Sequence, residues 1–343
     1  MISFECDYNN GAHPQVLHHL IETNDLQSLT YGFDKWSVCA KEKIRKACKD
    51  DEAQVYFLVG GTQTNATVID GLLESYQAVI SAETGHINVH EAGAVEHSGH
   101  RVIALPSRNG KLDAKELADY MEWFVNDEST EHLVQPGMVY ISFPTEYGTI
   151  YSAKELENIY ETCHRYELKL FVDGARMGYG LMAEGCDITM PWLARHCDAF
   201  YIGGTKVGAL CGEAVVFTHN NAPKHFFSII KQHGALLAKG RLTGVQFDAL
   251  FTDGLYFDIS SHAITMAMRM KKMFEEKGYK FYLDSLTNQQ FVVLDNEEMA
   301  RLEKHFIFTH WDKFDNDHTI CRFVTSWATT DEDLENLRSV VLG

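Results

Sequence analysis

Two apolar segments of the chain each lead into a residue that could do chemistry. Residues 171–176 read FVDGAR and residues 201–206 read YIGGTK, so one segment delivers Asp173 and the other delivers Lys206. The interval between them has room for a strand, a crossover and a second strand. A lysine can form a Schiff base, and an acid can keep a pyridine nitrogen protonated. Enzymes that use pyridoxal 5′-phosphate (PLP) need both, and the pair therefore predicts a PLP enzyme.

The neighbours of these two residues support the same chemistry. Asp173 follows an expected strand, and ligands of open α/β sheets bind at the carboxyl ends of strands. Lys206 lies among Gly203, Gly204 and Gly208, which leave room for a bulky adduct. Burying a lysine between apolar strands without a function would be costly. A structural alternative for Asp173 is that it caps the next helix.

A candidate phosphate site follows an earlier expected strand. Residues 60–65 read GGTQTN, where Gly61 would let backbone N–H groups approach an anion and Thr62 would add a hydroxyl. The start of a helix supplies further donors and positive partial charge. An ordinary strand-to-helix turn is an equally good interpretation of this segment, and the ending typical of a P-loop is absent.

A candidate ring-binding segment lies between the phosphate candidate and the Asp–Lys pair. Residues 85–94 read GHINVHEAGA and contain His86, His90 and a glutamate. An imidazole stacked on a pyridine ring would hold the plane of a cofactor. Either histidine could instead be structural, because most of the 17 histidines of the chain must be.

The elements that must position these residues alternate between strands and helices. Alternation of this kind predicts an α/β fold with a mostly parallel central sheet. Strands are expected at 53–60, 101–105, 138–143, 168–172, 198–202 and 213–217, and helices at 14–24, 65–79, 113–124, 153–166 and 189–196.

The last part of the chain has a different pattern. A long helical run at 261–277 is followed by expected strands at 290–294 and 320–325 and a helix at 331–340. We therefore expect a large PLP-binding domain over residues 1–257, including the N-terminal segment, and a smaller C-terminal α+β domain over residues 258–343. The chain length also favours two domains.

Composition restricts the partners. A net charge of −18 argues against nucleic acid, which is bound by clustered lysine and arginine. No signal peptide and no apolar run long enough to span a membrane is evident. The eight cysteines are scattered without the spacing of a zinc or redox motif, so we expect no metal and a reducing, cytoplasmic setting.

Taken in order, the motifs resemble one family. The segments GGTQTN, GHINVHEAGA, DGAR, GGTKVGALCG and RFVTS lie at 60–65, 85–94, 173–176, 203–212 and 322–326. Together they are similar to the threonine aldolase/β-eliminating lyase group of PLP enzymes, which have the aspartate aminotransferase fold. The resemblance extends over almost the whole chain, and the ordered set is far more specific than any one segment.

The resemblance implies a role for each matching position. His86 would stack on the ring, Asp173 would bind the pyridine nitrogen, Lys206 would carry PLP, and Arg176 would contact cofactor or substrate. Arg322 would clamp the substrate carboxylate. The implied set comprises catalytic Lys206, His86, Asp173 and Glu146; cofactor-binding Gly61, Thr62, His86, Asp173, Arg176, Thr205, Lys206, Lys231 and Arg241; and substrate-binding Arg322, Arg176, Tyr8 and His90.

Two segments depart from the family pattern. The usual N-terminal Ser-Asp-Thr-Val-Thr-Arg-Pro is replaced by CDYNNGA at residues 6–12, so its carboxylate contacts are expected to be lost. A histidine that interacts with the substrate hydroxyl is replaced by Glu146. A carboxylate can act as a base if its pKa is raised.

The resemblance implies a low-specificity threonine aldolase, which cleaves a β-hydroxy-α-amino acid to glycine and an aldehyde. Glu146, His90 or a water that they orient could remove the hydroxyl proton. Tyrosines at 8, 147 and 179 would suit a bulky side chain. The alternatives are β-elimination or racemisation, with Lys206 removing the α-proton, and a PLP-binding protein without catalysis. A dinucleotide-dependent oxidoreductase is disfavoured because the glycine fingerprint is missing.

The resemblance also implies an assembly. Sites of this fold form at a subunit interface, so a homodimer or homotetramer is expected. The basic segment 231–241, which contains Lys231, Lys239 and Arg241, would reach the phosphate of a neighbouring subunit.

Overall fold

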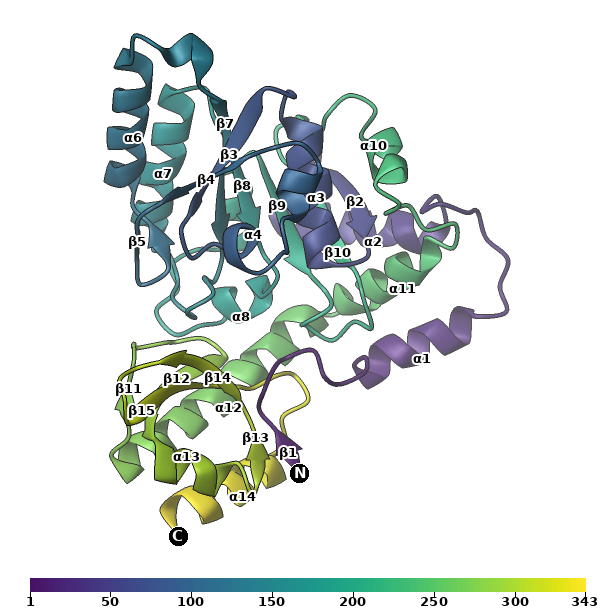
Figure 1. The fold of residues 1–343 in the computed structure, drawn as a ribbon. Helices are drawn as coiled ribbons and strands as arrows, with labels where there is room; N and C mark the ends of the chain where they lie inside the picture. The colour runs from purple at the N-terminus through teal and green to yellow at the C-terminus, as the bar shows by residue number, and fades with distance from the viewer.

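A computed structural model describes residues 1–343 and is built around a seven-stranded sheet (Figure 1). The strand order is β2-β10-β9-β8-β7-β3-β4, and every strand is parallel to its neighbours except β10, which runs opposite to both β2 and β9. The predicted α/β class with a mostly parallel sheet is therefore confirmed. The strands are β2 (Gln54–Leu58), β3 (Gln77–Ala82), β4 (Val102–Leu105), β7 (Gln135–Ser142), β8 (Lys169–Asp173), β9 (Ala199–Gly203) and β10 (Glu213–Phe217).

Helices cover both faces of this sheet, so its strands are buried on two sides and consist of nearly continuous apolar runs. One apolar cluster of 48 buried residues packs α1 (Pro14–Thr23), α2 (Lys35–Cys48), α6 (Ala114–Asn126), α7 (Ala153–Arg165), α9 (Met190–Leu193) and α11 (Arg241–Leu250) against one face. A second cluster, on the other face, includes α3 (Gly61–Leu72), α4 (His86–Val89), α5 (Ala94–His97) and α10 (Phe226–Gln232).

Two of these helices begin in different ways. Ser152 and Glu155 form a reciprocal capping box at the start of α7, which satisfies two backbone donors of its first turn. By contrast, α3 begins at Gly61, and its N-cap residue Gly60 makes no side-chain capping hydrogen bond. The first amides of α3 are therefore left free at the edge of the sheet.

The expectation of one helix over residues 65–79 was wrong. The helix α3 ends at Leu72, and Gln77–Ala82 form β3, an interior strand between β7 and β4. Five of the six residues of β3 are buried. Apolar residues at helical spacing continue into this strand, and only its neighbours in the sheet distinguish the two structures. The helix expected at 189–196 is reduced to the single turn α9.

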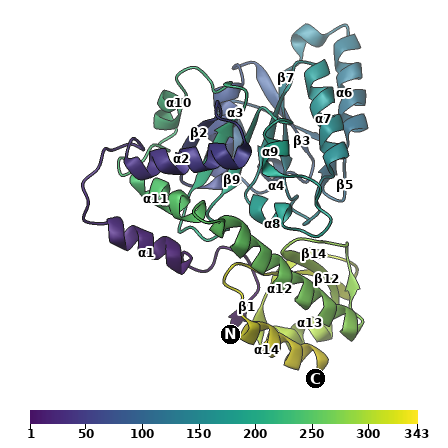
Figure 2. The same cartoon turned by 180° about the vertical axis from the view of Figure 1, so that it is seen from behind.

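The C-terminal part has its own sheet and apolar cluster. Strands β11 (Lys280–Phe281), β12 (Gln289–Asp295), β15 (His318–Val324) and β14 (Thr309–Lys313) form a four-stranded antiparallel sheet in that order. It packs with α13 (Asn296–Leu302) and α14 (Asp331–Leu342). Figure 2 shows this part below the large sheet, with the N-terminus beside it. The short strands β1 (Ile2–Ser3) and β13 (Phe306–Ile307) pair in parallel and account for that proximity.

The helix α12 (Leu255–Lys277) connects the two parts of the chain. Its first turns, with Tyr256 and Ile259, belong to the large cluster, and its later turns, with Met270 and Phe274, belong to the C-terminal cluster. The predicted boundary at 257/258 falls inside the first turn of this helix. The division into two domains remains a prediction.

The remaining elements are short. They are β5 (Ser107–Arg108), β6 (Lys111–Leu112), α8 (Met177–Leu181) and the 3₁₀ turn Thr130–His132. None of the helices is both long enough and apolar enough to cross a bilayer.

Candidate active site

A cavity of about 270 Å³ lies at the carboxyl edge of the parallel strands, where this fold class binds its ligands. It brings together residues from the N-terminal segment, from the start of α3 and from the ends of β7, β8 and β9. The lining residues are Tyr8, Gly61, Thr62, His86, Glu91, Ser142, Pro144, Glu146, Asp173, Ala175, Arg176, Tyr201, Thr205, Lys206 and Glu213.

Asp173 ends β8 and is held as a carboxylate. Its Oδ2 accepts hydrogen bonds from Tyr140 Oη at 2.5 Å and from Asn65 Nδ2 at 2.9 Å. Burial would raise the pKa of Asp173, but the nearby His86 and these hydrogen bonds outweigh burial and lower the pKa below its usual value. The cavity therefore contains a buried, ionised acid.

A second chain of hydrogen bonds orients His86. The Nδ1 atom of His86 lies 2.8 Å from Glu91 Oε1, and the same oxygen accepts a hydrogen bond from Asn65 Nδ2 at 2.7 Å. Asn65 thus joins the carboxylate of Asp173 to the carboxylate that positions His86. This network fixes the imidazole at the cavity wall, because each acceptor is itself held by a buried donor.

Lys206 follows β9 and lines the cavity opposite the N-terminal segment. Its backbone carbonyl accepts a hydrogen bond from Tyr179 Oη at 2.6 Å, and its Nζ lies 5.7 Å from the centre of the Tyr8 ring. Burial and the positive charge of Arg176 lower the pKa of Lys206. A lowered pKa favours the neutral amine, which is the nucleophilic form.

The start of α3 offers an anion-binding group of amides. The backbone N–H groups of Gly61, Thr62 and Gln63 make no hydrogen bond within the chain, as is usual in the first turn of a helix, and Gly61 and Thr62 line the cavity. A β-carbon at Gly61 would lie 3.2 Å from the hydroxyl of Tyr201. Glycine therefore suits the close approach at this position.

Glu146 lies in the same cavity with one oxygen already hydrogen-bonded. Its Oε1 accepts from Ser142 Oγ at 2.6 Å and from the backbone N–H of His86 at 2.9 Å. Burial raises the pKa of Glu146, although the hydrogen bond from Ser142 opposes that rise. A raised pKa makes this carboxylate a stronger base than an exposed glutamate.

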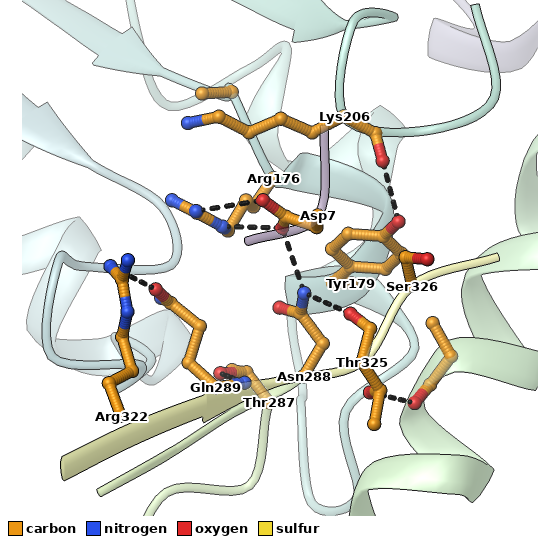
Figure 3. Close-up of polar contacts among 12 residues, drawn as sticks. Asp7, Arg176, Tyr179, Lys206, Thr287, Asn288, Gln289, Arg322, Thr325 and Ser326 are labelled. Carbon is orange, nitrogen blue, oxygen red and sulfur yellow. Dashed lines mark hydrogen bonds and ion pairs between the residues drawn. The ribbon is translucent and has the colours of Figure 1, made fainter. Parts of the chain in front are cut away.

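Arg176 is engaged by the N-terminal segment (Figure 3). Its Nε and Nη2 donate to Asp7 Oδ2 at 2.7 Å and to Asp7 Oδ1 at 2.9 Å, and Asn288 Nδ2 donates to the same Asp7 at 2.8 Å. Asp7 belongs to the segment that departs from the family pattern. Although this segment departs from the family pattern, its Asp7 therefore makes an acidic contact to Arg176, which the sequence analysis did not predict.

Arg322, on β15, lies across from Arg176 in Figure 3 and has only weak partners. Its Nη1 donates to Gln289 Oε1 at 3.3 Å and its Nη2 to Thr309 Oγ1 at 3.2 Å, while its buried Nε has no hydrogen-bond partner. Burial and the charge of Arg176 lower the pKa of Arg322 to about 10. A buried guanidinium with weak hydrogen bonds and an unused donor is suited to bind a carboxylate.

The cavity thus contains nine of the predicted site residues and leaves four outside its lining. Nine line it: Tyr8, Gly61, Thr62, His86, Glu146, Asp173, Arg176, Thr205 and Lys206. His90 lies beside it, with its ring centre 5.5 Å from that of His86, and Arg322 lies across from Arg176. In this single chain Lys231 lies over the ring of Tyr31, and Arg241 donates to the carbonyls of Thr23 and Leu26.

The structure adds residues that sequence reasoning missed. Asn65 and Tyr140 hold Asp173, Glu91 holds His86, and Asn288 holds Asp7. Asn65 and Glu91 lie inside motifs that were recognised, but nothing in their spacing distinguishes them from their neighbours. The contact of Tyr140 with Asp173 depends on the register of the sheet. Strand β7 pairs with β8 so that Ser142 lies opposite Asp173, and Tyr140 lies two residues earlier on β7.

Comparison with known proteins identifies the family. The chain is 30% identical over 263 residues to a low specificity L-threonine aldolase from Pseudomonas sp., which covers 76% of this chain and 74% of that protein. A structure of Leishmania major threonine aldolase superposes with a TM-score of 0.95 at 38% identity and covers 100% of this chain and 99% of that one. Cystalysin from Treponema denticola, whose structure contains PLP, has the same fold, with a TM-score of 0.70 at 14% identity, and covers 100% of this chain and 91% of that one.

The family model supports the same assignment. The model of the beta-eliminating lyase family matches residues 22–297, which include the cavity residues from Gly61 to Glu213. The resemblance of the motifs is therefore confirmed, and the chain belongs to the beta-eliminating lyase family.

Proposed function

We propose that this protein is a PLP-dependent aldehyde-lyase that cleaves β-hydroxy-α-amino acids, threonine among them, to glycine and an aldehyde. The observation that carries the proposal is the placement of Lys206, Asp173 and Glu146 around one cavity. Lys206 has an amine with a lowered pKa, Asp173 is a buried carboxylate, and Glu146 has a carboxyl group with a raised pKa. The three side chains can therefore perform different tasks in the reaction. The two threonine aldolases named above support the choice of substrate class.

The residues present fit PLP. The free amides at Gly61 and Thr62 suit its phosphate, the ionised Asp173 suits its ring nitrogen, and the oriented His86 suits its ring face. When bound, PLP would supply an aldehyde for a lysine amine and a ring that withdraws electrons from the substrate α-carbon.

The protein's own residues would then perform the remaining tasks. Lys206 presents an amine whose lowered pKa increases its neutral fraction, and Asp173 keeps a proton at the ring nitrogen because its own pKa is low. Arg322 binds the substrate carboxylate and so fixes which bond of the α-carbon is aligned for cleavage. Glu146 accepts the β-hydroxyl proton as the carbon–carbon bond breaks and the hydroxyl carbon becomes the aldehyde. Return of a proton to the α-carbon then gives glycine.

Product analysis tests this proposal. The PLP-loaded protein is incubated with L-threonine and with L-allo-threonine. Glycine with acetaldehyde is the expected result. Ammonia with 2-oxobutyrate would instead assign the protein to β-elimination, with Lys206 as the base that removes the α-proton. Absence of any product with PLP bound would contradict the proposed substrate class.

Replacing Glu146 by glutamine is expected to lower kcat with L-threonine about 10²- to 10⁴-fold, because the variant keeps the side-chain shape and loses the base. In the parent enzyme the rate falls as the pH drops through the raised pKa of Glu146, since only the ionised form accepts a proton. That acidic limb should disappear in the variant. A pH profile of kcat measures both effects.

Ser142→Ala provides the matched control for Glu146. It removes the 2.6 Å hydrogen bond that opposes the rise in the pKa of Glu146 and keeps the carboxyl group. The acidic limb should therefore move to higher pH while the maximal rate is largely kept. An unchanged acidic limb in both variants would exclude Glu146 as the base.

Replacing Arg322 by alanine is expected to raise KM for L-threonine about 10- to 100-fold, because a charge-assisted carboxylate contact is lost. Arg322→Lys should recover only part of the loss, since an ammonium cannot make the paired contact. Arg338→Ala, at a half-exposed arginine of α14, is the control and should leave KM unchanged. Steady-state kinetics at saturating PLP measure the effect, and an unaltered KM in Arg322→Ala would remove this residue from the substrate site.

The proposed assembly is a homodimer or homotetramer. Within one chain the basic side chains that line the cavity are His86, Arg176 and Lys206, and Arg176 is already paired with Asp7. A phosphate would therefore gain a cation if Lys231, Lys239 or Arg241 of a second copy reached it. The proposed location is the cytoplasm, which is consistent with eight cysteines that form no disulfide.

A further inference from the structure

Glu213 is a buried carboxyl group in the cavity that the mechanism above does not use. It is 3% exposed and is the first residue of β10, the reversed strand of the large sheet. Because β10 runs opposite to its neighbours, its first residue lies at the edge where those strands end. Its register partners are Leu58, which leads into the amides of α3, and Gly203, which leads into Lys206.

The contacts of Glu213 hold the turn that precedes Lys206. Its Oε2 accepts the backbone N–H of Gly204 at 3.0 Å, and its Oε1 accepts the hydroxyl of Thr205 at 2.7 Å. Neither partner carries a positive charge. An ionised carboxylate buried in this way would be poorly compensated.

The surroundings keep Glu213 protonated at neutral pH. Burial raises the pKa of Glu213 to about 8, and although the charge of Lys206 opposes the rise, that of Asp173 adds to it. The other titratable groups facing it are Tyr201 on β9, Tyr256 on α12 and Cys211, whose pKa values are all raised by burial. Protonation therefore gives Glu213 a donor as well as an acceptor.

A protonated Glu213 leaves one hydrogen unused in these contacts. Gly204 N–H donates to one carboxyl oxygen, and a single hydrogen bond joins the other oxygen to the hydroxyl of Thr205, so only one of the two hydrogens on Glu213 and Thr205 is used. The same cavity contains the free amides of Gly61 and Thr62. An anion bound by those amides would share the cavity with either a neutral acid, which provides the spare hydrogen, or a carboxylate, which repels it.

On the basis of the proposed function, we propose that Glu213 is a positioning residue for the cofactor. The cavity binds the phosphate of the cofactor only while Glu213 is a neutral acid. Phosphate affinity is then linked to one proton on this side chain. The affinity for the phosphate is therefore highest below the pKa of Glu213 and is lost as the pH rises through that pKa. Glutamine, which cannot ionise and still has a donor and an acceptor, should reproduce the neutral state at every pH.

The test is the dissociation constant of PLP, measured by absorbance on cofactor-stripped protein for the parent and for Glu213→Gln. With a pKa of about 8 for Glu213, the ratio of the parent to the variant constant should rise about tenfold between about pH 7 and about pH 9. The variant provides the comparison because the ionisation of PLP and of Lys206 affects both proteins equally. Pyridoxal, which lacks the phosphate, should give a ratio that does not change with pH.

Each of the other possible results would contradict either the role of Glu213 or the proposed function. A ratio for PLP that is independent of pH would refute the role of Glu213 and leave the proposed function intact. The same rise with pyridoxal would show that Glu213 acts through Lys206 and not through the phosphate. A parent protein that binds no PLP would refute the proposed function itself.

Folding of the variant is checked separately. Thermal melting of the stripped proteins should show that Glu213→Gln is folded. If it is not, sulfate, which keeps a double charge over this pH range, is used as a competitor of PLP on the parent protein. The inhibition constant of sulfate, calculated with the PLP dissociation constant measured at the same pH, should rise about tenfold between about pH 7 and about pH 9 if Glu213 controls the anion site. An inhibition constant that is the same at both pH values would contradict the inference.

Discussion

The Lys206→Ala variant is expected to lose the visible absorption band of protein-bound PLP and to lose aldolase activity by roughly 10⁴- to 10⁶-fold. The lysine is buried beside Arg176, and both burial and that charge lower its pKa, so its amine is available as a nucleophile. Alanine removes the amine and leaves the backbone contact from Tyr179 to residue 206 in place. Absorbance after PLP is added and product formation from L-threonine measure the two losses.

Lys154→Ala is the control for this experiment. Lys154 is an exposed lysine of α7 that pairs with Glu157 and does not line the cavity. This variant should keep both the band and the activity. A visible band that persists in Lys206→Ala would defeat the assignment of Lys206, whatever the residual activity.

The second large effect is expected at Asp173. Asp173→Asn should still bind PLP through Lys206 but should lower kcat about 10²- to 10³-fold, because an amide cannot hold a proton on the ring nitrogen as an ionised carboxylate does. The parent carboxylate is kept ionised by His86 and by hydrogen bonds from Tyr140 and Asn65, which lower its pKa despite burial. Steady-state kinetics with L-threonine, together with a spectrum of the loaded variant, distinguish lost catalysis from lost cofactor.

Tyr140→Phe should cause a smaller loss in kcat of the same origin. It removes the 2.5 Å hydrogen bond to Asp173 and keeps the carboxylate, so the pKa of Asp173 should rise and the loss in kcat should be smaller than in Asp173→Asn. An asparagine variant with the parent kcat would show that the proton on the ring nitrogen is held by some other group.

Much of the fold could be predicted because buried strands of a parallel sheet are short apolar runs. The strand expected at 213–217 agrees with β10 at both ends, and the helix expected at 153–166 agrees with α7 to one residue. The helix expected at 65–79 failed because Gln77–Ala82 have an apolar pattern that either structure could use. Packing between β7 and β4 decides in favour of the strand.

Chemistry-bearing residues could be predicted where an unusual residue type follows an apolar run. Asp173 and Lys206 stand out because a charged residue at the end of a buried strand needs a reason. The motifs also indicated which segments meet at one cavity, since Gly61, His86, Asp173 and Lys206 each come from a different motif and all line it. The sequence by itself thus determined the family, the cofactor chemistry and nine of the residues that line the cavity.

The tertiary structure alone decided how these groups are partnered. It pairs Arg176 with Asp7, which leaves Arg322 as the cation with an unpartnered buried nitrogen, and it places Glu213 where burial raises the pKa of its carboxyl group to about 8. The physical reason is that pKa and hydrogen-bond partners depend on burial and on distances of a few ångströms. Contacts between residues as distant in sequence as Asp7 and Arg176 are created by the crossing of strands and helices, and local sequence carries no record of them.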